Sequence, residues 1–370
     1  MRGRLKIGKV AGVPVSLHWS LIAVGSLLAL QLANGLLPSN HPGHSATTYW
    51  ALGVGAAVVF FGAVLAHELA HAVVAKRRGV GVEGIELWAL GGLARLSRDP
   101  ASPGDEFLIA VAGPLASLAA AAVFLGIAAG IEAAGLPQVV AATFGWLGVT
   151  NLILGAFNLL PAAPLDGGRI LRAAVWKSSG NRVKGMHTAA KAGQALGMAV
   201  LFGGMWLVLL GRGTLFLPFI GWFLLNSARM EEVGVRTEAA LLGKQVRDAT
   251  WFGVARATDA TDVATMLWQS SRMGPTRLVA VERFDGSLSG LVSEDQLWRI
   301  PEEDRSGVRL AQIAVPMEQL AHAEPDELLM DAARRMNPLA PVLTVWDAGR
   351  LVGVVTTEQF RRLIEARKTI

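Results

Sequence analysis

Four long apolar runs constrain the fold of this 370-residue chain more than any other feature. A helix needs roughly 20 apolar residues to cross a bilayer. Four stretches reach that length: residues 17–37, 48–75, 107–131 and 139–160. Two shorter apolar stretches follow at residues 196–210 and 214–225. We therefore expect a multi-pass α-helical membrane domain of about six transmembrane helices.

The composition agrees with a membrane protein. Hydrophobic residues make up 52% of the chain and charged residues only 17%, which is unlike a soluble globular domain. Cysteine is absent from the sequence, which excludes disulfides, thiol catalysis and cysteine-bound metal. The first apolar run is too long for the hydrophobic region of a signal peptide, so we expect a retained helix.

The basic residues predict the orientation in the membrane. The net charge is +5, and Lys and Arg gather at the ends of apolar runs, in residues 1–9, 76–78 and 169–184. Cytoplasmic loops of membrane proteins carry such an excess of positive charge. We therefore expect a protein of the cytoplasmic membrane with its N-terminus and C-terminal region in the cytosol. The same pattern favours contact with the lipid bilayer over nucleic-acid binding.

A polar cluster interrupts the second apolar run. The sequence HELAH places His67, Glu68 and His71 at its end. Residues four apart lie on one face of a helix, so both imidazoles can bind one metal ion while Glu68 reaches a water molecule on that ion. Ionisable groups in hydrocarbon are costly and usually functional. The alternative is a pair of buried, hydrogen-bonded histidines.

Asp166 offers a third ligand from a distant segment. A catalytic zinc ion takes three protein ligands and leaves one position for water. The segment FNLLPAAPLDGGRILRA, residues 157–173, follows the fourth run, and Pro161 and Pro164 interrupt the helix there. Two glycines after Asp166 let the backbone turn sharply and approach a metal closely. The predicted topology puts Asp166 and His67 at the same depth.

Together, HELAH and FNLLPAAPLDGGR resemble the site-2 protease family of intramembrane zinc metalloproteases, over residues 17–177. The resemblance implies one zinc ion per chain, held by His67, His71 and Asp166, with Glu68 as the base that activates water. It also implies that Asn158 holds the substrate backbone or the developing oxyanion. A hydrogen bond at the end of a helix would explain Asn158 equally well.

Two further segments match features of the same family. LWALGGLARL, residues 87–96, stands where the family has a membrane-associated hairpin that receives substrate; a plain amphipathic loop is the alternative. AGPLAS, residues 112–117, is similar to the start of the family's small-residue helix near the active site. Close packing between helices would also account for its small residues.

The sequence changes from apolar to charged after residue 228. We expect a membrane domain at residues 1–228, a polar linker at 229–244 and a soluble α/β module at 245–366. The module consists of two β-α-β-β-α copies, about 245–305 and 306–366. These copies resemble a pair of cystathionine-β-synthase (CBS) repeats, which implies a regulatory module with an adenine-nucleotide site or a homodimer interface. However, glutamine stands at positions 296 and 359, where the nucleotide-binding pattern has aspartate.

The predicted function is intramembrane proteolysis. We expect zinc-dependent hydrolysis of a peptide bond in or near the transmembrane segment of a single-pass protein, by resemblance an anti-sigma factor. The alternatives are a CBS-regulated membrane transporter, a non-catalytic scaffold, and a zinc peptidase for prenylated tails, which uses a glutamate ligand instead of an Asp-Gly-Gly turn. The sequence lacks the Gly-x-Ser-Gly loop and the paired membrane aspartates of other intramembrane proteases.

Overall fold

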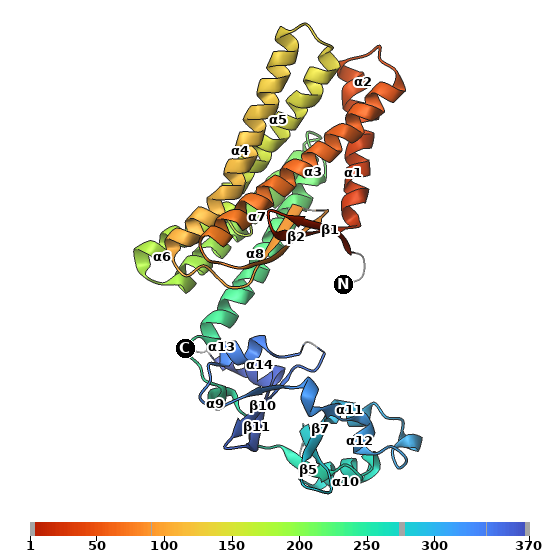
Figure 1. Cartoon of the computed structure of the whole chain (residues 1–370), viewed down its shortest axis with the longest axis vertical. Coiled ribbons are helices and arrows are strands. Elements are labelled where there is room, and N and C mark those ends of the chain that lie inside the picture. Colours follow the sequence, from red (N-terminus) through yellow and green to blue (C-terminus); the bar gives the residue numbers. More distant parts are fainter. Residues whose placement is uncertain (1–3, 90, 274–277, 338, 367–370) are drawn as a thin grey trace. The chain divides into compact units, whose positions relative to one another are not determined.

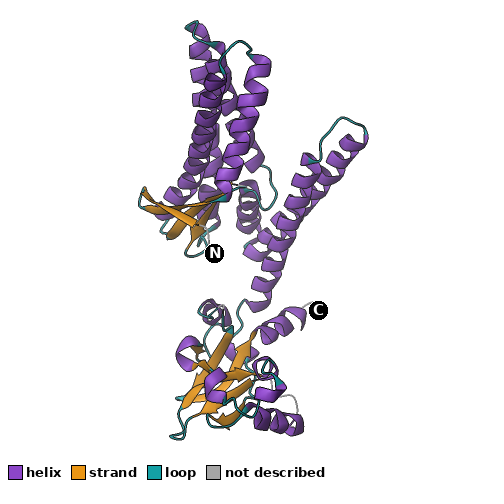
Figure 2. Cartoon of the chain, turned by 90° about the vertical axis from the view of Figure 1, so that its right-hand side faces the viewer, coloured by secondary structure: helices purple, strands orange, loops and turns teal. Residues whose placement is uncertain are grey.

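A computed structural model describes residues 4–89, 91–273, 278–337 and 339–366. The chain forms two compact units, Met1–Val235 and Arg236–Ile370. The first unit is a bundle of long helices with a small sheet at one end, and the second is an α/β unit (Figures 1 and 2). This confirms a helical membrane region followed by an α/β region.

Long helices dominate the first unit. Three of them begin at a side-chain cap: Ser45, Ser102 and Asn181 each accept a hydrogen bond from the backbone N–H three residues further on. In chain order the helices are α1 (Ser20–Gln31), a π-helical segment (Leu32–Leu36) continued by α2 (Leu37–Asn40), α3 (Ala46–Arg77), α4 (Pro103–Ala133), α5 (Gln138–Asn158), α6 (Asp166–Ser179), α7 (Arg182–Leu209) and α8 (Phe216–Leu241).

The described residues contain five helices long and apolar enough to cross a membrane, instead of the six expected. They are Ser20–Asn40, Ala46–Arg77, Pro103–Ala133, Gln138–Asn158 and Arg182–Leu209. The expected sixth stretch, residues 214–225, supplies the first turns of α8. That helix soon carries Arg229, Glu231 and Glu232, so its apolar part is too short for a span of its own.

A four-stranded sheet lies at the end of the bundle where α1 begins and α3 ends (Figure 1). Its strands are β1 (Arg4–Val10), β2 (Val13–His18), β3 (Val82–Trp88) and β4 (Gly91–Leu96), in the order β1-β2-β3-β4. The antiparallel β3–β4 pair confirms the expected hairpin. The β1–β2 hairpin was not predicted, although Ala11 and Gly12, both with positive φ, form the two-residue turn typical of such hairpins.

Small residues bring the long helices close together. A Cβ atom at Gly155 of α5 would lie 3.1 Å from the Pro114 carbonyl oxygen of α4. Between α7 and α8, a Cβ at Gly221 would lie 2.2 Å from the Leu201 backbone nitrogen. Membrane helices associate through such close backbone contacts because lipid gives them little hydrophobic drive to pack. The α7–α8 pair is therefore closely packed.

A buried ion pair joins α4 to α6. The Arg172 guanidinium contacts Glu106 Oε1 through both Nε and Nη2, and Glu106 is fully buried. Arg172 Nη1 also lies 3.9 Å from Glu231 Oε1 on α8. A buried carboxylate is stable only when its charge is compensated. Arg172 therefore fixes α6 against the start of α4.

The second unit repeats one motif twice. The first copy is β5 (Ala255–Thr258), α10 (Val263–Met273), β6 (Leu278–Glu282), β7 (Leu288–Ser293) and α11 (Glu294–Trp298). The second copy is β9 (Ala321–Ala323), α13 (Leu329–Arg334), β10 (Val342–Asp347), β11 (Arg350–Thr356) and α14 (Thr357–Ala366). Short elements flank them: α9 (Val246–Ala249), a 3-10 turn (Glu302–Asp304), α12 (Leu310–Ile313), β8 (Val315–Pro316) and a second 3-10 turn (Met317–Gln319).

Both copies have the same strand pairing, which confirms the predicted repeat. The first strand runs parallel to the second, and the second runs antiparallel to the third, in each copy. The copies share a hydrophobic core in which Leu278 and Leu291 of the first pack with Leu351 and Val354 of the second. Neither copy could bury these side chains alone.

Gln296 and Gln359, one in each copy of the repeat, cap the N-terminus of a helix. Gln296 Oε1 accepts a hydrogen bond from the Ser293 backbone nitrogen at 2.8 Å, and Gln359 Oε1 accepts one from the Thr356 nitrogen at 3.0 Å. Each closes the N-terminus of α11 or α14. Nucleotide binding by this unit stays a prediction, as does a homodimer. The expected linker, residues 229–244, is helical as far as Leu241 because α8 continues through it.

Replacing Arg172 tests the buried ion pair. We expect Arg172→Met to destabilise the solubilised protein by about 3–5 kcal/mol, because Glu106 would stay buried without its partner. Denaturant unfolding in detergent micelles measures this change. Arg361→Met is the control, since its pair with Glu358 is on the surface and should contribute less than about 1 kcal/mol. Equal stability of the Arg172 variant and the wild type would contradict the assignment.

Candidate metal centre

The HELAH residues lie in the last third of α3. His67 and His71 are each 5% exposed and stand one helical turn apart, with their rings 4.9 Å apart between centroids. Their Nε2 atoms are separated by 3.2 Å. The helix spacing therefore brings both imidazoles to one point, as the sequence predicts.

Asp166 completes a group of three. It is the first residue of α6, and its Oδ2 atom lies 3.1 Å from Nε2 of His67 and 3.1 Å from Nε2 of His71. In the part of the chain that the structure describes, these residues form the one group of three or more His, Asp or Glu side chains that could hold a metal ion. Ligands about 2.0–2.1 Å from a tetrahedral zinc ion stand about 3.3 Å apart. The three atoms are thus spaced as one face of such a site.

Hydrogen bonds to the far side of each ring orient the imidazoles. His71 Nδ1 lies 2.6 Å from the Ile109 carbonyl oxygen, which can only accept, so Nδ1 carries a proton. In neutral His71 the Nε2 lone pair therefore points toward Asp166. His67 Nδ1 lies 2.9 Å from Ser117 Oγ. Partners of this kind fix the tautomer and orientation of metal-binding histidines.

The ligand atoms call for a cation. Burial would raise the pKa of Asp166, but the two imidazoles outweigh it and hold this pKa below its ordinary value. When both histidines are neutral, their Nε2 lone pairs and the ionised Asp166 carboxylate face one another with no proton between them. These groups then repel one another. A divalent metal ion satisfies all three groups at once, and the His2Asp set suits zinc. The residues present therefore fit the predicted ion.

Gly113 of α4 makes room for the ligand atoms. A Cβ atom there would lie 2.2 Å from Nε2 of His71 and 2.6 Å from Nε2 of His67. Two residues of the segment 112–117 therefore serve the site. Gly113 leaves space for the ligand nitrogens, and Ser117 Oγ contacts His67 Nδ1. Sequence reasoning noted the segment but could not assign either contact, because both depend on how α4 crosses α3.

The glycines after Asp166 permit the sharp turn that was predicted, through close backbone packing rather than through a left-handed conformation. Gly167 and Gly168 lie in the first turn of α6 and have no left-handed backbone conformation. A Cβ at Gly167 would lie 2.1 Å from the Leu160 carbonyl oxygen, and one at Gly168 would lie 2.6 Å from the Ala163 nitrogen. Their role is close packing of α6 on the preceding non-helical segment, which carries Asp166 to the histidines.

The metal ligands line a cleft of about 630 Å³. Glu68 lies in this cleft against β4, where a Cβ at Gly92 would stand 2.7 Å from Glu68 Oε1. Asn158 lines the same cleft, and its Nδ2 donates to the Leu154 carbonyl oxygen at 3.0 Å. This is the helix-end hydrogen bond considered as its alternative role. All five predicted site residues therefore meet in one cleft.

Aromatic and aliphatic side chains of α8 form another wall of the cleft. Phe219, Ile220 and Phe223 are among them. Arg169, one turn after Asp166 on α6, also lines the cleft and was not predicted as a site residue. The cleft thus combines an apolar wall, an edge strand and a compact polar centre.

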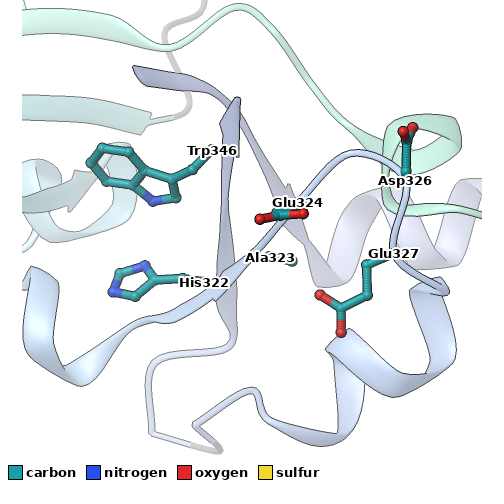
Figure 3. Close-up of a pocket in the computed structure, with 6 residues that line it drawn as sticks. All are labelled: His322, Ala323, Glu324, Asp326, Glu327 and Trp346. Carbon is teal, nitrogen blue, oxygen red and sulfur yellow. The ribbon is translucent and has the colours of Figure 1, made fainter. Parts of the chain in front are cut away.

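A second hollow, of about 810 Å³, lies in the C-terminal unit (Figure 3). His322 and Trp346 lie on one side of it, and both rings contact Thr344 Oγ1, at 2.6 and 3.0 Å. Its carboxylates are largely paired: Asp326 lies 2.9 Å from Arg247, and Glu327 lies 2.5 Å from Arg335. Among the residues that the structure describes, none of these side chains belongs to a group that could hold a metal ion.

Comparison with known proteins identifies the family. The model of peptidase family M50 matches residues 55–138 and 129–203. A Mycobacterium tuberculosis protein named as zinc metalloprotease Rip3 is 37% identical over 369 residues, which cover 99% of this chain and 94% of that protein. The chain belongs to peptidase family M50. This confirms the predicted resemblance to site-2 proteases and the enzyme class, a zinc metalloprotease.

Two solved structures are similar to parts of this M50 chain. The site-2 protease from Methanocaldococcus jannaschii is 31% identical, covers 62% of this chain and 95% of its own, and has a TM-score of 0.42. The CBS domain of a bacterial CNNM/CorC family Mg²⁺ transporter is 24% identical, covers 36% of this chain and 82% of its own, and has a TM-score of 0.29.

Gly113 provides a test of the metal centre. We expect Gly113→Ala to lower zinc affinity at least tenfold, because the new methyl group would overlap the ligand nitrogens of His67 and His71. Zinc content of the purified M50 peptidase, followed during dialysis against a graded chelator, measures the loss. Gly126→Ala is a matched control on the same helix, where a Cβ meets nothing within 4 Å. Equal zinc affinities would show that the centre lies elsewhere.

Ser117 provides an independent test. We expect Ser117→Ala to weaken zinc binding about 10–100-fold, the usual cost of losing the outer partner of a histidine ligand. The same chelator titration measures it. Ser39→Ala, which removes an exposed hydroxyl on α2, should leave the affinity unchanged. A Ser117 variant that holds zinc as tightly as wild type would refute the orienting role.

Proposed function

We propose that this M50 peptidase hydrolyses a peptide bond in or near the transmembrane segment of a single-pass membrane protein. The observation that carries the proposal is the shared cleft: three metal ligands, a glutamate and an edge strand, enclosed within a bundle of membrane-capable helices. The substrate is a transmembrane protein because such a chain can reach the cleft from the lipid. An anti-sigma factor fits this description.

The chemistry divides between the metal and Glu68. His67, His71 and Asp166 would hold zinc, which when bound would supply a water molecule of lowered pKa, about 7, and polarise the scissile carbonyl. The Glu68 carboxylate accepts a proton from the attacking water and donates it to the leaving amine nitrogen. Glu68 is adjacent in sequence to His67 and three residues before His71 on α3. The helix therefore holds its carboxylate close to the two histidines.

Strand β4 is suited to hold the substrate. A transmembrane helix hides each carbonyl in a hydrogen bond, so it must unwind before hydrolysis. Among the described strands β4 pairs with β3 alone, and Gly91, Gly92 and Leu93 line the cleft. An unwound peptide can add to this free edge through backbone hydrogen bonds. We therefore expect substrates with helix-breaking or small residues near the cleavage site.

A substrate trap tests the proposed function. We expect Glu68→Gln to keep zinc but to lower the rate of cleavage about 10²–10⁴-fold, because the amide cannot accept the proton of water. Membranes expressing this variant should accumulate a single-pass protein that wild type converts to a shorter fragment. Pull-down with quantitative mass spectrometry measures both. Glu132→Gln, an exposed change at the end of α4, is the control.

The trap also separates the rival functions. A transporter or scaffold predicts identical membrane proteomes for wild type, Glu68→Gln and the control. That result, with full zinc content in all three, would refute the protease assignment for this chain. Transport that survives Glu68→Gln would favour the transporter instead.

A further inference from the structure

Arg169 is a charged residue of the cleft that the hydrolysis described above does not use. It lies on α6 one turn after Asp166, and residues three apart are neighbours on a helix. Helical side chains lean toward the N-terminus of their helix. Arg169 lines the same cleft as Glu68 and Asp166, and the Asp166 carboxylate is near enough to favour its charge.

The Arg169 side chain is not committed to another residue. No hydrogen bond or ion pair joins it to any side chain or carbonyl among the described residues. The neighbouring acids are engaged elsewhere: Asp166 with the two histidines, and Glu106 and Glu231 with Arg172. Burial, and next the charge of Arg172, lower the pKa of Arg169. Asp166, Glu106 and Glu231 act in the opposite direction, but none of them contacts the Arg169 guanidinium.

Counting charges shows what the cleft lacks. With a divalent ion bound, the carboxylates of Glu68 and Asp166 balance the two positive charges of the metal. Glu106 and Glu231 favour the charge of Arg169 from nearby but contact Arg172, so no carboxylate among the described residues pairs directly with the Arg169 guanidinium. A partly buried cation without a direct partner in the protein is costly, and an anionic ligand in the cleft would relieve that cost. A carboxylate is the best match, because guanidinium binds it through two parallel hydrogen bonds.

We propose that Arg169 binds a carboxylate of the peptide chain in the cleft. This inference rests on the proposed protease function and adds a specificity-determining residue to it. Two sources supply this chemistry. One is an acidic side chain of the substrate near the scissile bond; the other is the new C-terminal carboxylate that hydrolysis creates.

Peptide binding distinguishes the two sources. The full-length, zinc-loaded Glu68→Gln protein in detergent micelles serves as the host, so that peptides bind without turnover. The probes are fluorescent Leu/Ala transmembrane peptides with one Gly-Pro pair, in which a single Glu or Gln is scanned across the six positions around that pair. A second set ends at the pair, as a free carboxylate or an amide. Fluorescence anisotropy gives each dissociation constant.

The deciding quantity is the ratio of the dissociation constant of each amide peptide to that of its matching acid peptide. We expect at least one Glu peptide, or the free-carboxylate product, to bind about tenfold or more tightly than its amide match, as for a charged hydrogen bond. Adding Arg169→Met should reduce that ratio to about one. Arg77→Met, an exposed change at the end of α3, should preserve it. Preference in the Glu scan identifies a substrate side chain, and preference in the truncated set identifies the product.

Two results would overturn the inference. One is the absence of any acid preference in the host with Arg169 intact; the other is the same preference after Arg169→Met. Cleavage of the neutral peptides by the protein with Glu68 intact keeps this failure separate from that of the proposed function. If those peptides are cleaved without acid preference, only the role of Arg169 is wrong. If they are neither bound nor cleaved, both proposals fail.

Discussion

Convergence of three ligand atoms at one buried point is the constraint on which the membrane unit depends. His67, His71 and Asp166 bring their nitrogens and oxygen within 3.1–3.2 Å of one another. Such groups repel unless a cation or a proton lies between them. The surrounding structure maintains this arrangement: Ile109 and Ser117 fix the rings, Gly113 leaves space for them, and α6 is locked against α4 by the buried pair of Arg172 and Glu106.

The sequence alone predicted the parts of the site that depend on local spacing. His67, Glu68 and His71 follow from the period of one helix, and Asp166 from a broken helix at the matching depth. The contacts of Gly113 and Ser117 and the place of Arg169 in the cleft were not predictable, because they depend on how α4 and α6 cross α3. The sharp turn at Gly167 and Gly168 was predicted, but the backbone groups against which they pack were not.

The fold shows the same division between local and tertiary information. Apolar length located four spans, and the duplicated pattern gave the C-terminal repeat with its strand order. The length of the apolar run at residues 214–225 could not decide whether it spans the membrane, because this run and the charged residues after it form one helix, α8. The β1–β2 hairpin was missed because its basic residues were interpreted only as a membrane anchor, although strand alternation and the Ala11–Gly12 turn are visible in the sequence.

The position of the metal centre along α3 bears on how a membrane can house a hydrolase and still act as a barrier to ions. At 1.5 Å per residue, α3 extends about 30 Å from Ala46 to His67, close to the thickness of the hydrocarbon layer. Water that enters from the end of the bundle carrying α6 and the sheet reaches the ligands without crossing that length. The rest of α3 separates the ligands from the far end of the bundle by about the thickness of the hydrocarbon layer.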